Sequence, residues 1–135
     1  MMRRTIFALP LAWITLGWTG AALGQTNDCG DLANQGEMNA CFEREYREAD
    51  AELNKTYEAL RDRVSSTGRE TLRDAQRAWI AYRDAQCAFE SAGTEGGSIH
   101  PTIVAICRTE LTRTQTRRLR RQLDCEEGDL SCGGQ

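Results

Sequence analysis

Six cysteines are the side chains of this sequence with the clearest chemistry. Zinc sites use closely spaced ligand pairs such as C-x-x-C, and this chain has no such pair and a single, isolated histidine, His100. An even number of cysteines in a short exported chain is typical of a disulfide framework. We therefore predict disulfides and no bound metal or cofactor. The cysteines are Cys29, Cys41, Cys87, Cys107, Cys125 and Cys132.

The remaining reactive side chains form no catalytic set. Ser-His or Cys-His catalysis needs a histidine base, and only His100 is available, while the cysteines are assigned to disulfides. The 20 Asp and Glu residues would allow a paired-carboxylate site. Most of them stand beside Arg on polar helical faces, which is the pattern of a solvated surface. Residues 93–97 lack the Lys and the preceding strand of a phosphate-binding loop. We expect a protein that is not an enzyme.

The glycine-rich segment 93–100 is the best candidate for a binding site. Glycine adopts backbone shapes that are closed to other residues. A disulfide between Cys87 and Cys107 would hold the base of this loop, so that binding would cost little conformational entropy. The alternative is a plain connector, in which His100 is a helix cap or a surface residue. The candidate partner-binding residues are Gly96, Gly97, Ser98 and His100.

Two further groups have a structural explanation. An arginine run would suit a polyanion, but no aromatic residues interleave with it, so we interpret it as an exposed helical face neutralised by the tail acids Glu126, Glu127 and Asp129. Four aromatic residues could line a pocket, but their helical spacing favours core packing. The arginines are Arg113, Arg117, Arg118, Arg120 and Arg121. The aromatic residues are Trp79, Tyr82, Tyr57 and Phe42.

Residues 1–24 have the layout of a cleaved secretory signal peptide. Arg3 and Arg4 precede an uncharged apolar stretch that is too short for a membrane span, and small residues end at Gly24. Cleavage before Gln25 would leave 111 residues and change the formal net charge from −3 to −5. We expect a periplasmic or secreted acidic domain, which attracts a cationic protein and has no reason to bind nucleic acid.

Three amphipathic segments with short joints predict an all-α, up-down-up bundle of three helices. The first begins at the cap Asn34 and carries an apolar stripe to Val64. The second begins with a capping box at Thr67, and the third begins at Pro101, with His100 extended before it. We assign residues 1–24 to the signal peptide, 25–125 to the helical domain and 126–135 to an acidic tail. The predicted inward stripe of the second segment is Leu72, Ala75, Trp79, Tyr82, Gln86 and Phe89. That of the third is Ile103, Ile106/Cys107, Leu111, Thr114/Gln115, Arg118/Leu119 and Leu123.

The helices narrow the pairing of the cysteines. Six cysteines allow 15 pairings, and sequence alone does not choose among them. Cys87 and Cys107 flank the glycine-rich loop, so a bridge there would join the second and third helices. Cys29 can reach the first helix, and the last two cysteines would close the tail. We predict three local bridges, with no free thiol: Cys29–Cys41, Cys87–Cys107 and Cys125–Cys132.

A combination of motifs gives a family resemblance. The motifs are Met38-Asn39-x-Cys41, Tyr46, Asp50, Leu53-Asn54, Tyr57, Ala75-Gln76-x-Ala78-Trp79, Tyr82-Arg83-Asp84, Cys87, Gly96-Gly97-Ser98, Pro101 and Cys107. Between Cys29 and Leu123 the chain resembles the LprI-type lysozyme inhibitor family of bacterial exported proteins. The resemblance implies a helical domain of the periplasm or cell surface that inhibits lysozyme, the muramidase that cuts peptidoglycan.

Two functions remain open from the sequence. The first is an exported inhibitor that blocks lysozyme with the 93–100 loop. The alternative is a non-catalytic binding or scaffold module of the cell envelope, with a periplasmic protein or a peptidoglycan fragment as its partner. A periplasmic hydrolase ranks last, because no nucleophile–base pair is found.

Overall fold

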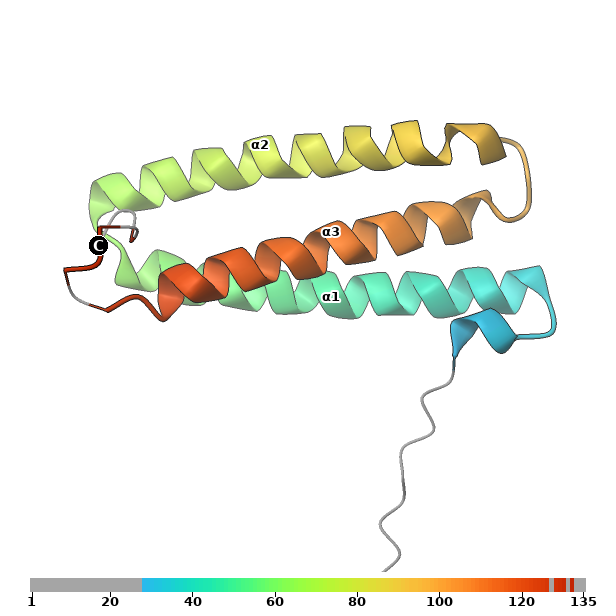
Figure 1. The fold of residues 1–135 in the computed structure, drawn as a ribbon, viewed down its shortest axis with the longest axis horizontal. Helices are drawn as coiled ribbons and strands as arrows, with labels where there is room; N and C mark the ends of the chain where they lie inside the picture. The colour runs from blue at the N-terminus through green and yellow to red at the C-terminus, as the bar shows by residue number, and fades with distance from the viewer. Residues whose placement is uncertain (1–27, 127, 131, 133–135) are drawn as a thin grey trace, which may run out of the picture.

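Three long helices form an up-down-up bundle (Figure 1). The structure is a computed structural model, and it describes residues 28–126, 128–130 and 132. The helices are α1 (Gln35–Arg63), α2 (Ser66–Ser91) and α3 (His100–Leu123), with short 3-10 turns at Cys29–Asp31 and Ala92–Thr94. The described residues contain no strand, and the predicted all-α bundle is confirmed. The predicted signal peptide and its cleavage site lie outside the described residues.

The start of α1 is as predicted from the sequence. The starts of α2 and α3 each differ from the prediction by one or two residues. The Asn34 side chain accepts a hydrogen bond from the Glu37 N–H at 2.9 Å, as predicted. The cap of α2 is Ser65 rather than Thr67, and its hydroxyl accepts from the Gly68 N–H at 3.1 Å. Buried Val64 ends α1 by bonding back to the Leu60 carbonyl, so the joint closes immediately after it.

Helix α3 begins one residue earlier than predicted, at His100. The sequence placed His100 in extended geometry before Pro101. In the structure the His100 N–H donates to the Gly97 carbonyl at 3.2 Å, and this turn draws the residue into the helix. Pro101 occupies the first turn, where its missing N–H is not needed.

Helices α1 and α3 pack along most of their length. The inward face of α3 is small and largely threonine, and apart from Cys107 its buried residues are spaced by three and four, which places them on one helical face. Two of the four buried hydroxyls bond within the helix: Thr109 donates to the Ala105 carbonyl at 2.7 Å and Thr116 to that of Thr112 at 2.9 Å. The Thr102 hydroxyl donates instead to Asn39 of α1 at 2.6 Å. A satisfied hydroxyl can be buried at little cost. The buried residues of α3 are Thr102, Ala105, Cys107, Thr109, Thr112, Thr116 and Leu119.

The third predicted stripe is therefore wrong at several positions. It omitted the four buried threonines, and it placed Ile106 inside, although that side chain is 41% exposed. Cys107 and Leu119 are buried as expected. The compact centre of the bundle joins Leu53, Leu60, Val64 and Leu119, with Tyr57, Leu72, Trp79 and Leu123 packed against it.

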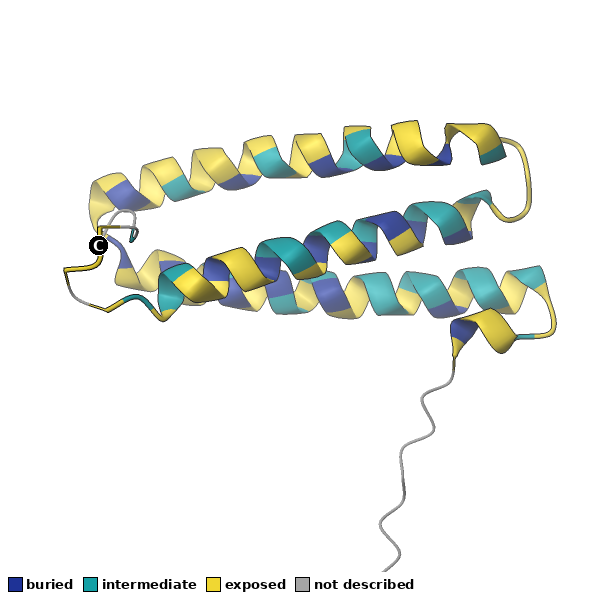
Figure 2. Cartoon of the chain, in the orientation of Figure 1, coloured by how far each residue is buried: buried dark blue, intermediate teal, exposed yellow. Residues whose placement is uncertain are grey.

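Helix α2 contacts α3 more than α1 and turns an unexpected face inward. Its buried residues include Gln76, Arg83 and Cys87. Three members of the predicted inward stripe are wrong, because Ala75 is exposed, Tyr82 is 53% exposed and Phe89 is 78% exposed. Figure 2 shows much of the outer side of α2 as exposed. Of the aromatic residues predicted to lie in the core, Trp79 and Tyr57 do so, and Tyr82 does not.

All three predicted disulfides are present, and no cysteine is free. Cys87–Cys107 ties the end of α2 to the start of α3, and Cys29–Cys41 ties the first 3-10 turn to α1. Each bridge contributes about 2–4 kcal/mol, a large share of the stability of a small domain. No helix among the described residues is long and apolar enough to cross a membrane.

Candidate functional site

The loop between α2 and α3 brings the four predicted partner-binding residues together at one end of the bundle. Gly96, Gly97 and Ser98 are exposed, and His100 is half-buried at the start of α3. The Cys87–Cys107 bridge spans the base of this loop. Figure 1 places it at the opposite end of the bundle from the C-terminal tail.

Hydrogen bonds fix the loop in one shape. The Glu95 N–H donates to the Ala92 carbonyl at 3.3 Å, and the Gly97 N–H donates to the Thr94 carbonyl at 3.0 Å. The Thr94 hydroxyl donates to the Ser91 carbonyl at 2.7 Å and lies 3.0 Å from His100 Nδ1. The sequence predicted a disulfide that holds the base of the loop, and these bonds order its tip as well.

Two glycines are required by this shape for different reasons. Gly96 has φ +77°, a left-handed conformation that costs most other residues energy. At Gly97 an added Cβ would lie 3.1 Å from the Thr94 carbonyl oxygen. The glycine pair therefore permits a turn that other residues would distort.

Asn39 of α1 holds the loop against the bundle, and the sequence analysis did not identify this role. Its Nδ2 donates to the Ser98 carbonyl at 3.0 Å, while its Oδ1 accepts from the Thr102 hydroxyl at 2.6 Å and from Gln35 Nε2 at 2.9 Å. The signal available was its place in the Met38-Asn39-x-Cys41 motif. The side chain joins the first turns of α1 and α3 to the tip.

The tip keeps backbone donors available. No hydrogen bond to another described residue uses the N–H of Gly96 or Ser98. Ile99 beside them is 43% exposed. The loop thus offers two amide donors and one apolar side chain in a preorganised arrangement, which suits recognition of a carboxylate-bearing surface.

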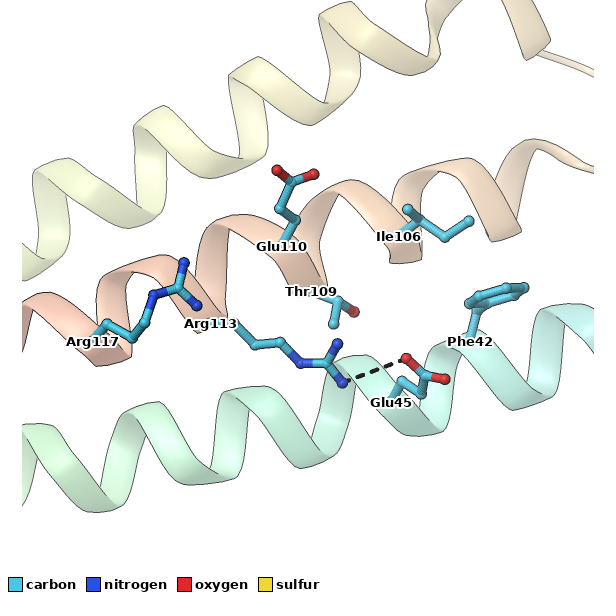
Figure 3. Close-up of a pocket in the computed structure, with 7 residues that line it drawn as sticks. All are labelled: Phe42, Glu45, Ile106, Thr109, Glu110, Arg113 and Arg117. Carbon is cyan, nitrogen blue, oxygen red and sulfur yellow. Dashed lines mark hydrogen bonds and ion pairs between the residues drawn. The ribbon is translucent and has the colours of Figure 1, made fainter. Parts of the chain in front are cut away.

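A second concave region lies between α1 and α3 (Figure 3). It has a volume of about 230 Å³, and a neighbouring hollow of about 400 Å³ shares Arg113 and Arg117 with it. Arg113 pairs with Glu45 at 3.5 Å, and Arg120 pairs with Glu52. Arg117 donates to the Thr114 hydroxyl at 2.9 Å and joins no ion pair with a described carboxylate. The first hollow is lined by Phe42, Glu45, Ile106, Thr109, Glu110, Arg113 and Arg117.

These contacts give the arginine run partners that the sequence analysis did not identify. The run lies on α3, with Arg113, Arg117, Arg118, Arg120 and Arg121 exposed as expected. Two of its members pair with carboxylates of α1, Arg113 with Glu45 and Arg120 with Glu52. Glu127, one of the predicted tail partners, lies outside the described residues. The sequence analysis did not predict the ion pairs between α1 and α3, because they depend on how the two helices face each other.

A buried arginine forms the centre of a third cluster. Arg83 lies 3.3 Å from Asp50 and 3.0 Å from Asp84, and its guanidinium carbon lies 5.6 Å and 5.2 Å from the ring centres of Tyr46 and Trp79. Its side chain is 8% exposed. Burial raises the pKa of the Tyr46 hydroxyl above 10.0, and the positive charge of Arg83 acts against this rise. The cluster fastens α2 to α1 by charge and by cation–π contact.

The tail contains one group with the composition of a metal site. Ligand atoms of Cys125, Asp129 and Cys132 lie within 4.8 Å of one another. Both sulfurs belong to the Cys125–Cys132 disulfide, so they supply no thiolate to a cation.

Comparison with known proteins assigns the chain to a family. A family model described as lysozyme inhibitor LprI matches residues 26–119. The chain belongs to the LprI family. An uncharacterized protein of Rhizobium meliloti (strain 1021) is 38% identical over 113 residues, which cover 74% of this chain and 81% of that relative. No solved structure matches the chain significantly.

The LprI resemblance rests largely on residues that the structure places in the frame of the bundle. Tyr46, Asp50, Trp79, Arg83 and Asp84 belong to the Arg83 cluster. The Gly96-Gly97-Ser98 motif lies instead at the exposed tip of the loop. Within this member of the family, the exposed glycine motif is therefore separate from the Arg83 cluster.

Proposed function

We propose that this chain is an exported inhibitor of lysozyme, and that its 93–100 loop enters the substrate cleft of the enzyme. The observation that carries the proposal is the family match, whose description names a lysozyme inhibitor rather than an enzyme. The preorganised tip supplies a contact surface of suitable form, because it protrudes from one end of a disulfide-tied bundle. Export is the condition under which such an inhibitor would meet its target.

The tip has the chemistry to meet a lysozyme cleft. Glycoside hydrolases of this kind carry two carboxyl groups beside the scissile bond. The amide groups of Gly96 and Ser98 are free of described partners and can donate to carboxylate oxygens. Ile99 adds an exposed apolar contact beside them. A loop that is already ordered loses little entropy on insertion.

Charge supports the encounter between the two proteins. The chain carries a formal net charge of −3, and removal of the predicted signal peptide would make it −5. Animal lysozymes are basic, so opposite charges would steer association and raise its rate at low ionic strength. Added salt should slow the onset of inhibition for the same reason.

The test is a turbidity assay of cell-wall lysis with the chain purified from the periplasm of an expression host. We expect stoichiometric loss of muramidase activity. Gly96→Asp should weaken inhibition by about tenfold or more, because a carboxylate at the tip would face the catalytic carboxylates. Aspartate tolerates the left-handed conformation of Gly96 better than most residues do, so the fold should persist.

Gly128→Asp is the matched control. Gly128 also has a positive φ, +89°, with open space around it. It belongs to the tail after α3, which lies at the other end of the bundle from the loop (Figure 1). The Gly128→Asp variant adds the same charge as Gly96→Asp and should inhibit lysozyme like the wild type. Equal potency of the wild type and Gly96→Asp would show that the loop is not the contact. Unchanged lysis with a molar excess of wild type would reject inhibition of that lysozyme.

The α1–α3 hollow favours a second candidate, a non-catalytic cell-envelope binding module. Arg117 offers a cation without a described carboxylate partner, and Phe42 offers a ring face in the same hollow. A peptidoglycan fragment carries both carboxylates and sugar rings. Binding of soluble muropeptides that is lost in Arg117→Gln, in a protein without effect on lysozyme, would favour this function.

A further inference from the structure

Helix α2 carries an exposed apolar stripe that none of the described residues covers. Its members are separated by three, four, three and four residues, which places them in one row along the helix. Tyr82 is 53% exposed and Phe89 is 78% exposed, values unusual for aromatic side chains of a monomer. We define the outer seam as Ala75, Ala78, Tyr82, Ala85 and Phe89.

The outer seam is distinct from the face of α2 that packs within the bundle. The inward row runs through Leu72, Gln76, Arg83 and Cys87. A helix with two such rows has the pattern of a helix packed between two neighbours. The outer seam contains no charged residue, and two flanking positions, Ala81 and Ala88, are also exposed alanines.

We propose that the outer seam pairs with the same seam of a second copy of this chain, with the two α2 helices antiparallel. The order of large and small residues is matched about a two-fold axis at Tyr82. Ala75 and Phe89 lie equally far from Tyr82 along the helix, so each Phe89 meets Ala75 of the second copy. Ala78 and Ala85 are nearly equidistant and meet as small residues, which lets the backbones approach closely. A two-fold interface requires this self-complementarity.

The charges of α2 favour the antiparallel direction. Residues 66–78 contain three arginines and two acids, whereas the exposed charged residues between Tyr82 and the start of α3 are Glu90, near the end of α2, and Glu95, just after it. Antiparallel pairing brings the net positive half of one helix toward the negative half of the other. Parallel pairing would bring like halves together and align the helix dipoles unfavourably. This complementarity identifies a second copy as the occupant that the seam fits.

The pairing has a consequence that rests on the proposed function. Residue 94 follows Tyr82 by 12 positions, or about 18 Å of helix at 1.5 Å per residue. The two glycine-rich loops would therefore lie about 36 Å apart, at opposite ends of the dimer. Such a dimer would leave both tips accessible to separate lysozyme molecules.

Sedimentation velocity over a range of concentrations tests the pairing with the full chain purified from the periplasm. The wild type should show a reversible dimer. Ala85→Arg places a charge in the seam and should raise the dissociation constant by about tenfold or more. Ala59→Arg, at an exposed alanine of α1, adds the same charge elsewhere and should leave the dimer unchanged. Circular dichroism checks that both variants remain helical.

Cross-linking tests the direction of the helices. In Tyr82→Cys the new thiols of two copies lie at the axis, so oxidised glutathione should join them, with the electrons passing to glutathione. Ala75→Cys alone should cross-link poorly and should cross-link well when mixed with Phe89→Cys. Peptide mapping would verify that the three native bridges remain.

A wild type that sediments only as a monomer, or a dimer that Ala85→Arg leaves intact, would overturn the pairing. Strong cross-linking of Ala75→Cys to itself would reject the antiparallel order. The lysozyme assay is independent, because a monomeric Ala85→Arg chain keeps its loop. It should still inhibit if the proposed function holds.

Discussion

Helices α2 and α3 join the bundle by different means. Helix α3 lies close along α1 through threonine, alanine and leucine side chains, and two of its four buried threonine hydroxyls bond to its own carbonyl groups. Helix α2 is held at fewer points: the contacts of Leu72 and Trp79 with the core, the Arg83 cluster, and the Cys87–Cys107 bridge.

The difference concerns where the stability resides. Continuous packing distributes the free energy of unfolding over many small contacts, each sensitive to volume. Helix α2 is attached through a few charged, aromatic and covalent contacts. These contacts concentrate the free energy of unfolding at a few positions and leave the other face of α2 exposed. We therefore expect substitutions to act differently on the two interfaces.

The largest effect should come from Leu53→Ala, at the centre of the α1–α3 packing. Leu53 is 1% exposed, so removal of three carbon atoms leaves a cavity and should lower the free energy of unfolding by about 3 kcal/mol. Leu72→Ala, at a half-buried leucine of α2, should cost about 1 kcal/mol. Urea unfolding followed by circular dichroism measures both values. Equal losses would mean that α2 is packed as continuously as α3.

A smaller effect is expected from Arg83→Met. Methionine keeps much of the side-chain volume but loses two cation–π contacts and the ion pairs to Asp50 and Asp84. Both carboxylates are more than a third exposed, so water screens these pairs and rehydrates the acids. The loss should be about 1–2 kcal/mol.

Hydrogen exchange should locate this loss in α2. Amides of α2 should exchange faster in Arg83→Met, while those of α1 and α3 change less. Arg77→Met, at an exposed arginine of the same helix, should leave stability within about 0.5 kcal/mol of the wild type. Uniformly faster exchange in all three helices would show that α2 is not a separate unit of stability.

The same contrast explains what the sequence could predict. The three helices follow from apolar spacing, caps and a proline, and the bridges follow from the nearness of each cysteine pair in the layout. The inward face of α2 was misassigned because Tyr82 and Phe89 are apolar, while Gln76 and Arg83 are polar. Burial of Arg83 depends on partners in other helices, which local periodicity does not contain. Two overlapping rows on one helix cannot be told apart before the helices are packed.

The candidate loop was predictable in position but not in shape. Glycine content marked residues 93–100, and the bridge at its base followed from Cys87 and Cys107. The bond from Asn39 to Ser98 joins residues 59 positions apart. No local sequence pattern predicts that hydrogen bond, which fixes the tip of the loop against the bundle.

The smallest predicted effect concerns a buried threonine in the α1–α3 packing. Thr112 is fully buried, and its hydroxyl has no hydrogen-bond partner among the described residues. Such a group carries a desolvation cost without a compensating bond. Thr112→Val keeps the shape and should raise the free energy of unfolding by about 1 kcal/mol.

Thr109→Val is the matched control for Thr112→Val. The Thr109 hydroxyl donates to the Ala105 carbonyl at 2.7 Å, and its removal should be neutral or cost about 0.5–1 kcal/mol. Urea unfolding of both variants gives the comparison. If Thr112→Val loses as much stability as Thr109→Val, the Thr112 hydroxyl is hydrogen-bonded in solution. All four buried threonines of α3 would then be hydrogen-bonded. Close packing of α1 against α3 alone would not explain why Thr112 is buried.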